Sequence, residues 1–234
     1  DQPRSRGLGD VYKRQPIPVP KTFKEPDSPV HVSVERTGRP YTFKEKKFTV
    51  PELDYWKQYS IIPEILEQYK VCSVVQFQSE NSEGNPFSYS STAEEPIYGY
   101  KNKRFIKLYR PFSKTRFLYG GNIGENYCFG LEQLPSKGDT LFITGGEKDV
   151  MSLAAKGFHA ICFNSETVTV PPNIIYKLTF RFKHIILLYD MDETGIESAK
   201  KHEKLLCEYG VKRLSLPLQG TKSEKDISDY FRAG

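Results

Sequence analysis

Apolar positions between residues 139 and 231 alternate between short continuous runs and stripes with helical spacing. The runs are typical of strands covered on both faces, and they span residues 140–144, 159–163, 184–189 and 211–216. Helical stripes separate the runs, one formed by Val150, Leu153, Ala154 and Gly157 and another by Ile196, Ala199, Leu206 and Tyr209. Gly210 is expected to end the second helix. Strands that alternate with helices predict a parallel sheet with right-handed crossovers.

Residues 49–134 show a different pattern, in which short aromatic-rich strands follow two small helices. The helices are expected to begin at Val50 and Pro63, because proline is favoured in the first helical turn. The strands are expected at residues 74–77, 97–100, 105–109 and 116–119, with a hairpin-like connection at 101–104. The predicted fold class is therefore α/β, with a C-terminal parallel sheet flanked by helices and a smaller α+β subdomain with antiparallel strands before it.

The first 48 residues are predicted to be a disordered or extended leader. Residues 1–15 have no periodicity and resemble a spurious end found on reading frames assembled from environmental sequencing, so we expect them to be non-native. The alternative is a flexible basic arm. Five prolines between residues 16 and 29 predict an extended linker. The expected domains are thus the leader at 1–48, an N-terminal subdomain at 49–134 and a C-terminal domain at 135–234.

Composition narrows the class of protein. Hydrophobic residues make up 38% and charged residues 27% of the chain, which is ordinary for a soluble protein. No apolar run approaches the roughly 20 residues that cross a bilayer. The four cysteines are scattered outside any zinc-binding spacing, so we expect reduced thiols, a cytoplasmic protein and no zinc in this chain. The net charge of +5 is only weak evidence for a polyanionic partner.

Acidic residues follow two of the predicted parallel strands. Asp190 and Asp192 come directly after the run at 184–189, and Glu147 and Asp149 follow the run at 140–144. Sites in open parallel sheets form at the carboxyl ends of strands, and alternate side chains of an extended D-x-D segment point the same way. Both aspartates can therefore face one cation, and Mg²⁺ prefers such hard oxygen ligands. The alternative is that these acids only cap helix N-termini.

Residues 101–117 contain seven basic residues and no acidic one, with four aromatic residues between them. Strand alternation places Lys103, Phe105, Lys107 and Tyr109 on one face. Clustered cations neutralise phosphates and exposed rings stack on unpaired bases, so we expect contact with a polyanion. Arg110 and Arg116 suit this task because a guanidinium binds phosphate oxygens bidentately. The alternative is a solvated strand whose aromatic rings belong to the core.

Three segments carry a resemblance to a known family: ITGGEKDVMSLA, LLYDMDETG and KSEKDISDYF. With them, residues 139–231 resemble a Toprim domain, the magnesium-binding catalytic fold of bacterial-type primases, type IA and II topoisomerases and related nucleases. The upstream segment DYWKQYSIIPEILEQYKV and the basic stretch resemble the N-terminal half of the catalytic core in phage-type primase-helicases. The resemblance covers most of the chain, from about residue 50 to residue 231.

The resemblance implies roles for the acidic residues. The family usually has glutamate where this chain has Gly145, and Glu147 aligns with an acid that phage-type members also carry. Asp190 and Asp192 fall on the D-x-D metal ligands, Asp149 on the acid of the first motif and Asp226 on a further acid near the metal. We therefore expect Glu147, Asp149, Asp190 and Asp192 to be catalytic. The residues expected to bind Mg²⁺, or Mn²⁺ as an alternative, are Asp190, Asp192, Glu147 and Asp226.

The function implied by this resemblance is a DNA primase core that makes RNA primers on single-stranded DNA by magnesium-dependent nucleotidyl transfer. The residues expected to contact template or nucleotide are Lys103, Lys107, Arg110, Lys114, Arg116, Lys148 and Lys225. Expected partners are single-stranded DNA, ribonucleoside triphosphates and a replicative helicase, fused or separate. The alternatives are a Toprim nuclease and a non-catalytic single-strand-binding module that accompanies a helicase, which Gly145 favours. Because no zinc module or P-loop helicase is recognisable, we expect a fragment or a split protein.

Overall fold

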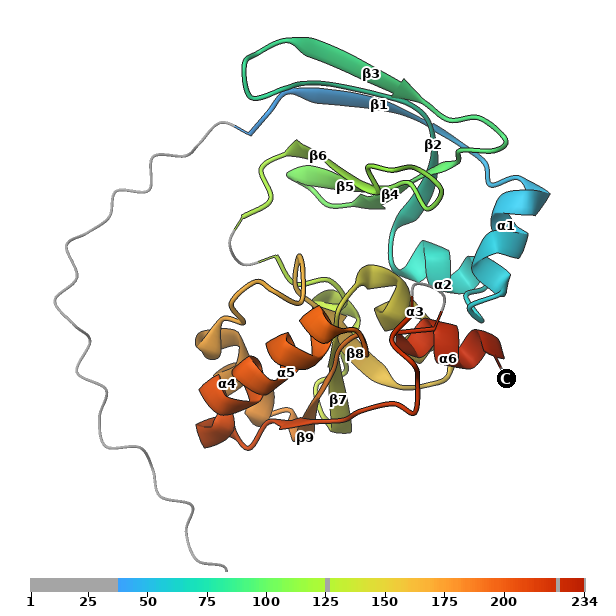
Figure 1. Cartoon of the computed structure of the whole chain (residues 1–234). Coiled ribbons are helices and arrows are strands. Elements are labelled where there is room, and N and C mark those ends of the chain that lie inside the picture. Colours follow the sequence, from blue (N-terminus) through green and yellow to red (C-terminus); the bar gives the residue numbers. More distant parts are fainter. Residues whose placement is uncertain (1–37, 125–126, 222–223, 234) are drawn as a thin grey trace, which may run out of the picture. The chain divides into compact units, whose positions relative to one another are not determined.

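The computed structural model describes residues 38–124, 127–221 and 224–233, which contain two sheets and six α-helices (Figure 1). The predicted non-native end and the proline-rich linker lie outside the described residues. One sheet is antiparallel and built from the N-terminal half, and the other is parallel and built from the C-terminal half. The predicted fold class is confirmed.

The antiparallel sheet has the strand order β1-β2-β4-β5-β6, with β3 also paired to β2. Its strands are β1 (Tyr41–Lys46), β2 (Val71–Glu80), β3 (Pro86–Ser90), β4 (Ile97–Lys101), β5 (Phe105–Tyr109) and β6 (Phe117–Gly121). The predicted hairpin at 101–104 joins β4 to β5. Strand β1 lies within the segment that was expected to be a leader. Its alternating pattern is only six residues long and follows the proline-rich linker. The antiparallel sheet therefore begins before residue 49.

Two short helices, α1 (Val50–Lys57) and α2 (Pro63–Gln68), begin where the prolines predict. A capping box fixes the start of α1, because the Thr49 backbone N–H donates to Glu52 Oε2 at 2.8 Å. The buried Glu52 also accepts a hydrogen bond from Ser73 on β2 at 2.8 Å. This acid ties the helix start to the antiparallel sheet.

The parallel sheet has the strand order β10-β9-β7-β8. Its strands are β7 (Gly138–Thr144), β8 (His159–Cys162), β9 (Phe182–Leu188) and β10 (Lys212–Arg213), so the predicted run at 211–216 forms only a two-residue strand. The predicted helices are α3 (Glu147–Ala155) and α5 (Glu193–Leu205). The sequence patterns left α4 (Pro172–Thr179) and α6 (Ile227–Ala233) unassigned.

Helices cover both faces of the parallel sheet. Ile175 of α4 and Ala199 of α5 pack with Leu187 in one hydrophobic cluster. On the opposite face, a second cluster joins residues of α3, α6 and β9 to residues of α1 and β4, and its members include Trp56, Tyr98, Met151, Leu188 and Ile227. The predicted boundary at 134/135 therefore separates the two sheets but does not separate their cores.

Strands β7 and β9 lie side by side in the middle of the parallel sheet, with Thr144 in register with Leu188. The chain leaves β7 toward β8 on one side, and β9 lies on the other side. This arrangement is a topological switch point, where open α/β sheets form their ligand sites. It brings the residues after 144 and after 188 together at one edge. None of the described helices combines the length and apolarity needed to span a bilayer.

Candidate active site

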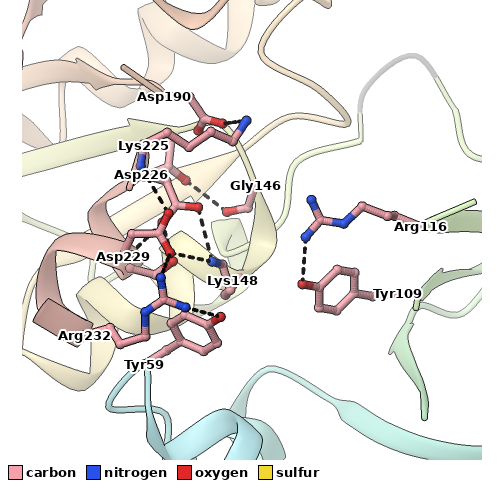
Figure 2. Close-up of polar contacts among 12 residues, drawn as sticks. Tyr59, Tyr109, Arg116, Gly146, Lys148, Asp190, Lys225, Asp226, Asp229 and Arg232 are labelled. Carbon is pink, nitrogen blue, oxygen red and sulfur yellow. Dashed lines mark hydrogen bonds and ion pairs between the residues drawn. The ribbon is translucent and has the colours of Figure 1, made fainter. Parts of the chain in front are cut away.

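Three aspartates from separate parts of the chain meet at this switch point. Asp149 lies in the first turn of α3, Asp190 follows β9, and Asp226 directly precedes α6. One carboxylate oxygen of each lies within 4.8 Å of the others. Figure 2 shows Asp190 and Asp226 among the lysines that hold them. Asp149 and Asp190, which follow two of the predicted parallel strands, therefore lie close together.

The environment of Asp149 suits a bound cation. Its side chain is only 4% exposed, and Oδ1 has no hydrogen-bond partner among the described residues. Burial, together with the charges of Asp226 and Asp190, holds the pKa of Asp149 well above its usual range. A buried, unpaired carboxylate oxygen beside two like charges is costly, and a divalent cation relieves that cost. Three hard oxygen donors in this geometry fit Mg²⁺ or Mn²⁺.

The D-x-D pair is organised by a lysine. Lys225 Nζ lies 2.6 Å from Asp190 Oδ2 and 2.7 Å from Asp192 Oδ2. Both aspartates thus lie beside the ammonium group of Lys225. Asp192 also caps α5 by accepting a hydrogen bond from the Gly195 N–H at 3.0 Å. The structure brings Asp192 to the lysine and to the helix cap, and does not place it in the cluster of three aspartates.

The two aspartates that share Lys225 differ in pKa. Burial and the neighbouring charges of Asp226 and Asp192 raise the pKa of Asp190 in spite of Lys225. Burial also opposes ionisation of Asp192, but Lys225 and the Gly195 N–H outweigh it and lower the pKa. Asp192 is therefore the better ion-pair partner for Lys225, and Asp190 remains available to a cation bound by the three aspartates.

Asp226 is held by a second lysine and by the start of α6. Lys148 Nζ lies 3.1 Å from Asp226 Oδ2 and 4.2 Å from the centre of the Tyr59 ring. Ser228 and the Asp229 N–H both donate to Asp226 Oδ1, at 2.6 and 2.7 Å. Burial works against ionisation of Asp226, but these donors and Lys148 outweigh it and lower its pKa. The predicted binding residues Lys148 and Lys225 thus serve first as partners of the site's carboxylates (Figure 2).

Glu147 points to a different set of partners. Its Oε1 accepts hydrogen bonds from Lys107 Nζ and from the Tyr127 hydroxyl, each at 2.7 Å. Lys107 also donates to the Asn164 carbonyl at 3.1 Å. Both members of the ion pair are almost fully buried. Glu147 therefore does not belong to the cluster of three aspartates. The Lys107 ammonium contacts both Glu147 and the Asn164 carbonyl.

Three basic residues of the segment at 101–117 form ion pairs, although the segment itself contains no acidic residue. Their partners come from elsewhere in the chain, where a local count of charges does not find them. Glu45 pairs with Lys101, Glu147 with Lys107 and Glu95 with Arg110. Arg110 also stacks over the Tyr89 ring at 4.3 Å. Lys103 and Lys114 are exposed, and they lie outside the cavity that the aspartates line.

The four aromatic residues of this segment are partly buried and partly exposed. Phe105 and Tyr109 are buried, so the core alternative holds for them. Phe112 and Phe117 are exposed. Of these four rings, only Phe112 and Phe117 have the exposure that contact with a base requires, and Phe117 also stacks on Tyr109.

A cavity of about 360 Å³ lies between the antiparallel sheet and the aspartate cluster. Its lining includes Asp149, Asp190 and Asp226 on one side and Lys107, Arg116, Phe117 and Tyr119 on the other. Arg116 donates from Nη2 to the Tyr109 hydroxyl at 3.2 Å and faces the cluster (Figure 2). A negatively charged ligand with bound cations can therefore contact acids and a guanidinium at once.

Glu166 belongs to this site but does not stand out in the sequence. It follows β8 on a loop and lines the cavity beside Asp190. Burial and the charges of Asp190 and Asp192 raise the pKa of Glu166 to about 7. Its position in the sequence is the one available signal. Glu166 comes soon after β8, just as Asp149 follows β7 and Asp190 follows β9.

Comparison with protein-family models gives one match, in which residues 142–231 match the family described as Toprim-like. These residues include all three aspartates of the cluster. The predicted resemblance to a Toprim domain is confirmed over these residues. No curated protein matches the sequence of the chain.

Solved structures share the fold over both halves. The E. coli primase catalytic core matches with a TM-score of 0.57 at 15% identity, covering 78% of this chain and 69% of that one. The primase fragment of the bacteriophage T7 primase-helicase protein matches with a TM-score of 0.51 at 18% identity, covering 74% and 66%. The DnaG primase catalytic domain bound to single-stranded DNA matches with a TM-score of 0.54 at 16% identity, covering 77% and 66%.

These matches define the class of fold. The chain has the fold of a primase catalytic core, with an antiparallel half followed by a Toprim-like half. It spans about two thirds of the length of the phage and DnaG structures that it matches.

Proposed function

We propose that this chain is the catalytic core of a DNA primase, which joins ribonucleotides on a single-stranded DNA template. The observation that carries the proposal is the cavity lined by three clustered aspartates on one side and by Arg116 on the other. A nucleoside triphosphate carries both a cation-binding phosphate chain and oxygens that a guanidinium binds. The cavity has the chemistry for both.

The aspartate cluster is the proposed seat of Mg²⁺. When bound, magnesium would neutralise charge that develops on the attacking and leaving oxygens during phosphoryl transfer. Asp149, Asp190 and Asp226 would hold the ion through one carboxylate oxygen each. Lys148 and Lys225 keep Asp226 and Asp190 in place through ion pairs.

The antiparallel half would position the substrates. Arg116 is the proposed phosphate-binding residue, because its guanidinium faces the cluster across the cavity. Phe117 and Tyr119 are partly exposed on the same lining, where unpaired bases can stack on their rings. Much of the rate would then come from alignment of the reacting groups.

The comparisons support the choice of partners. One matching structure is a DnaG primase catalytic domain bound to single-stranded DNA, and another is the primase fragment of a primase-helicase. We therefore propose single-stranded DNA and ribonucleoside triphosphates as ligands and a replicative helicase as partner, in the cytoplasm of a bacterium or a phage-infected cell.

A template-dependent primer assay tests this function. Purified chain would be incubated with single-stranded DNA, labelled ribonucleotides and Mg²⁺, in parallel with Asp226→Asn and with the control Glu193→Gln, which changes an exposed acid outside the cavity. We expect labelled oligoribonucleotides from the wild type and the control and none from Asp226→Asn. Absence of template-dependent product from the wild type would contradict the proposal.

One observation favours a second candidate, a single-strand-binding module without catalysis. Glu147, which the sequence nominates as a catalytic acid in the absence of a glutamate at Gly145, is buried against Lys107. In that case the wild type would make no primer, and its binding to single-stranded DNA would persist in Asp226→Asn. Cleavage of the DNA that is lost in Asp226→Asn would indicate a nuclease instead.

A further inference from the structure

Glu166 reaches the active site from the loop between β8 and α4. Its Oε2 atom is fully buried and has no hydrogen-bond partner among the described residues. Unlike Asp190, Asp192 and Asp226, Glu166 has no lysine paired with it in the described structure. A carboxylate oxygen shielded from water and left without a donor is unfavourable, so this atom requires an explanation.

Gly145 makes room for Glu166 beside Asp190. A Cβ atom added at residue 145 would lie 3.1 Å from Glu166 Oε2 and 3.0 Å from Asp190 Oδ1. Both carboxylates therefore border the same small space at the end of β7. Any side chain at residue 145 would press against both oxygens, so the glycine permits their approach.

Two carboxylates that border one space repel each other unless a cation or a proton lies between them. Lys225 approaches Asp190 through Oδ2, whereas the oxygen next to residue 145 is Oδ1. The neighbouring Asp149, nine-tenths buried or more, also leaves Oδ1 unpartnered in the described structure. Glu166 Oε2 and Asp149 Oδ1 are thus two acceptor oxygens near Asp190 that have no hydrogen-bond partner among the described residues.

We propose that Glu166 is a metal ligand, and that its carboxylate and Asp190 hold a divalent cation next to the Asp149–Asp190–Asp226 cluster. This inference deepens the proposed function, since it assigns to Glu166 a carboxylate role in the nucleotidyl-transfer site. Asp190 would then contribute to two neighbouring cation positions, as a carboxylate with two oxygens can. Gly145 is the positioning residue that leaves the space open.

The alternative is a protonated Glu166 that donates a hydrogen bond to Asp190. The two explanations respond differently to substitution. Glutamine keeps the size of glutamate and can donate a hydrogen bond, but its uncharged amide is a weak ligand for Mg²⁺ and Mn²⁺. Glu166→Gln therefore preserves the hydrogen-bonded arrangement and removes the metal ligand.

Binding of Mn²⁺ alone, measured by electron paramagnetic resonance of the free ion, tests the inference. The full chain would be titrated without nucleotide or DNA, as wild type, Glu166→Gln, Glu166→Asp and the control Glu193→Gln. Thermal unfolding without metal would verify that each variant is folded. The aspartate variant keeps the charge but shortens the side chain by one methylene group.

We expect Glu166→Gln to lose one bound Mn²⁺ or to weaken Mn²⁺ binding at least tenfold, with an intermediate loss in Glu166→Asp and none in Glu193→Gln. Mn²⁺ binding by folded Glu166→Gln that equals the wild type in stoichiometry and affinity would overturn the inference and indicate the hydrogen-bonded alternative. That outcome leaves the primase proposal intact. Conversely, a failed primer assay does not alter the Mn²⁺ result, because the titration contains no substrate.

Discussion

Lys107 and Glu147 form a buried ion pair with an Nζ–Oε1 distance of 2.7 Å and side-chain exposures of 3% and 2%. The pair joins β5 of the antiparallel sheet to the first turn of α3. Glu147 also accepts a hydrogen bond from Tyr127 at 2.7 Å. The two sheets of the primase-like core are therefore connected by a charge pair at the rim of the candidate active site.

Removal of one member of this pair should destabilise the protein strongly. Glu147→Gln or Lys107→Met leaves an uncompensated buried charge or donor, which typically costs about 3–5 kcal/mol. We expect a loss of this size in the free energy of unfolding, measured by urea denaturation. The double variant Lys107→Met/Glu147→Leu should lose less than the sum of the single losses, because no charge is left unpaired. Additive losses would contradict a coupled pair.

Mg²⁺ should stabilise the protein through the aspartate cluster. At about 100 times its Kd, a ligand that binds only the folded state adds about 2.7 kcal/mol. For a chain of this size we expect a rise in Tm of about 5–10 °C, measured by differential scanning fluorimetry with and without Mg²⁺.

Asp149→Asn provides the matched test of this stabilisation. It should abolish the Mg²⁺-dependent rise without lowering the metal-free Tm, because it removes one of several repelling charges. The exposed Glu193→Gln should behave as the wild type. An undiminished rise in Asp149→Asn would place the metal elsewhere.

Arg116 and Arg110 should differ in function although they lie six positions apart in the same basic segment. Arg116 lines the cavity, whereas Arg110 stacks on Tyr89 and pairs with Glu95. Loss of a hydrogen bond to a charged group typically costs about 1.5–3 kcal/mol, or about ten- to a hundredfold in affinity. We expect Arg116→Ala to weaken nucleoside triphosphate binding by that factor in a fluorescence titration, and Arg110→Ala to affect mainly stability. The reverse pattern would contradict the proposed phosphate contact.

His202 should make stability depend on pH. It is buried in α5, and its Nδ1 lies 3.0 Å from the Tyr189 hydroxyl. Burial, with a smaller effect of Lys201, lowers its pKa below the ordinary value of 6.5. The unfolded chain therefore binds a proton more readily, so stability is greatest above pH 6.5 and falls as the pH drops below it.

The His202 effect can be isolated by comparison with His202→Gln. Urea unfolding at pH 7.5 and pH 5.5 should show a larger loss of stability on acidification in the wild type than in the variant. Equal losses would show that His202 does not contribute.

The sequence predicts part of the site, because a strand and the residues that follow it can be recognised from the local apolar pattern. The apolar runs before Asp149 and Asp190 identify two parallel strands, and parallel strands bring their carboxyl ends to one edge. The positions of both aspartates follow from that rule. Only the resemblance to a family points to Asp226, since the short α6 after it carries no clear periodic pattern.

Pairings between distant residues are not a local signal. Nothing in the sequence around Lys107 shows that Glu147 neutralises it, because the basic segment itself contains no acidic residue. Glu166 is a second example, since nothing around it in the sequence shows that it lies beside Asp190 and Gly145. Strand β1 is not evident from the local pattern either, because it pairs with residues of β2 that lie 27 to 38 positions away in the sequence.

A crystal structure of the chain with Mn²⁺ and a ribonucleoside triphosphate tests the central claim most directly. Anomalous scattering would locate the manganese independently of any assumption about its ligands. The account predicts a manganese peak among Asp149, Asp190 and Asp226, with the triphosphate in the same cavity against Arg116. Manganese absent from these aspartates, or a nucleotide bound in the separate cavity lined by Lys70 and Arg104, would contradict it.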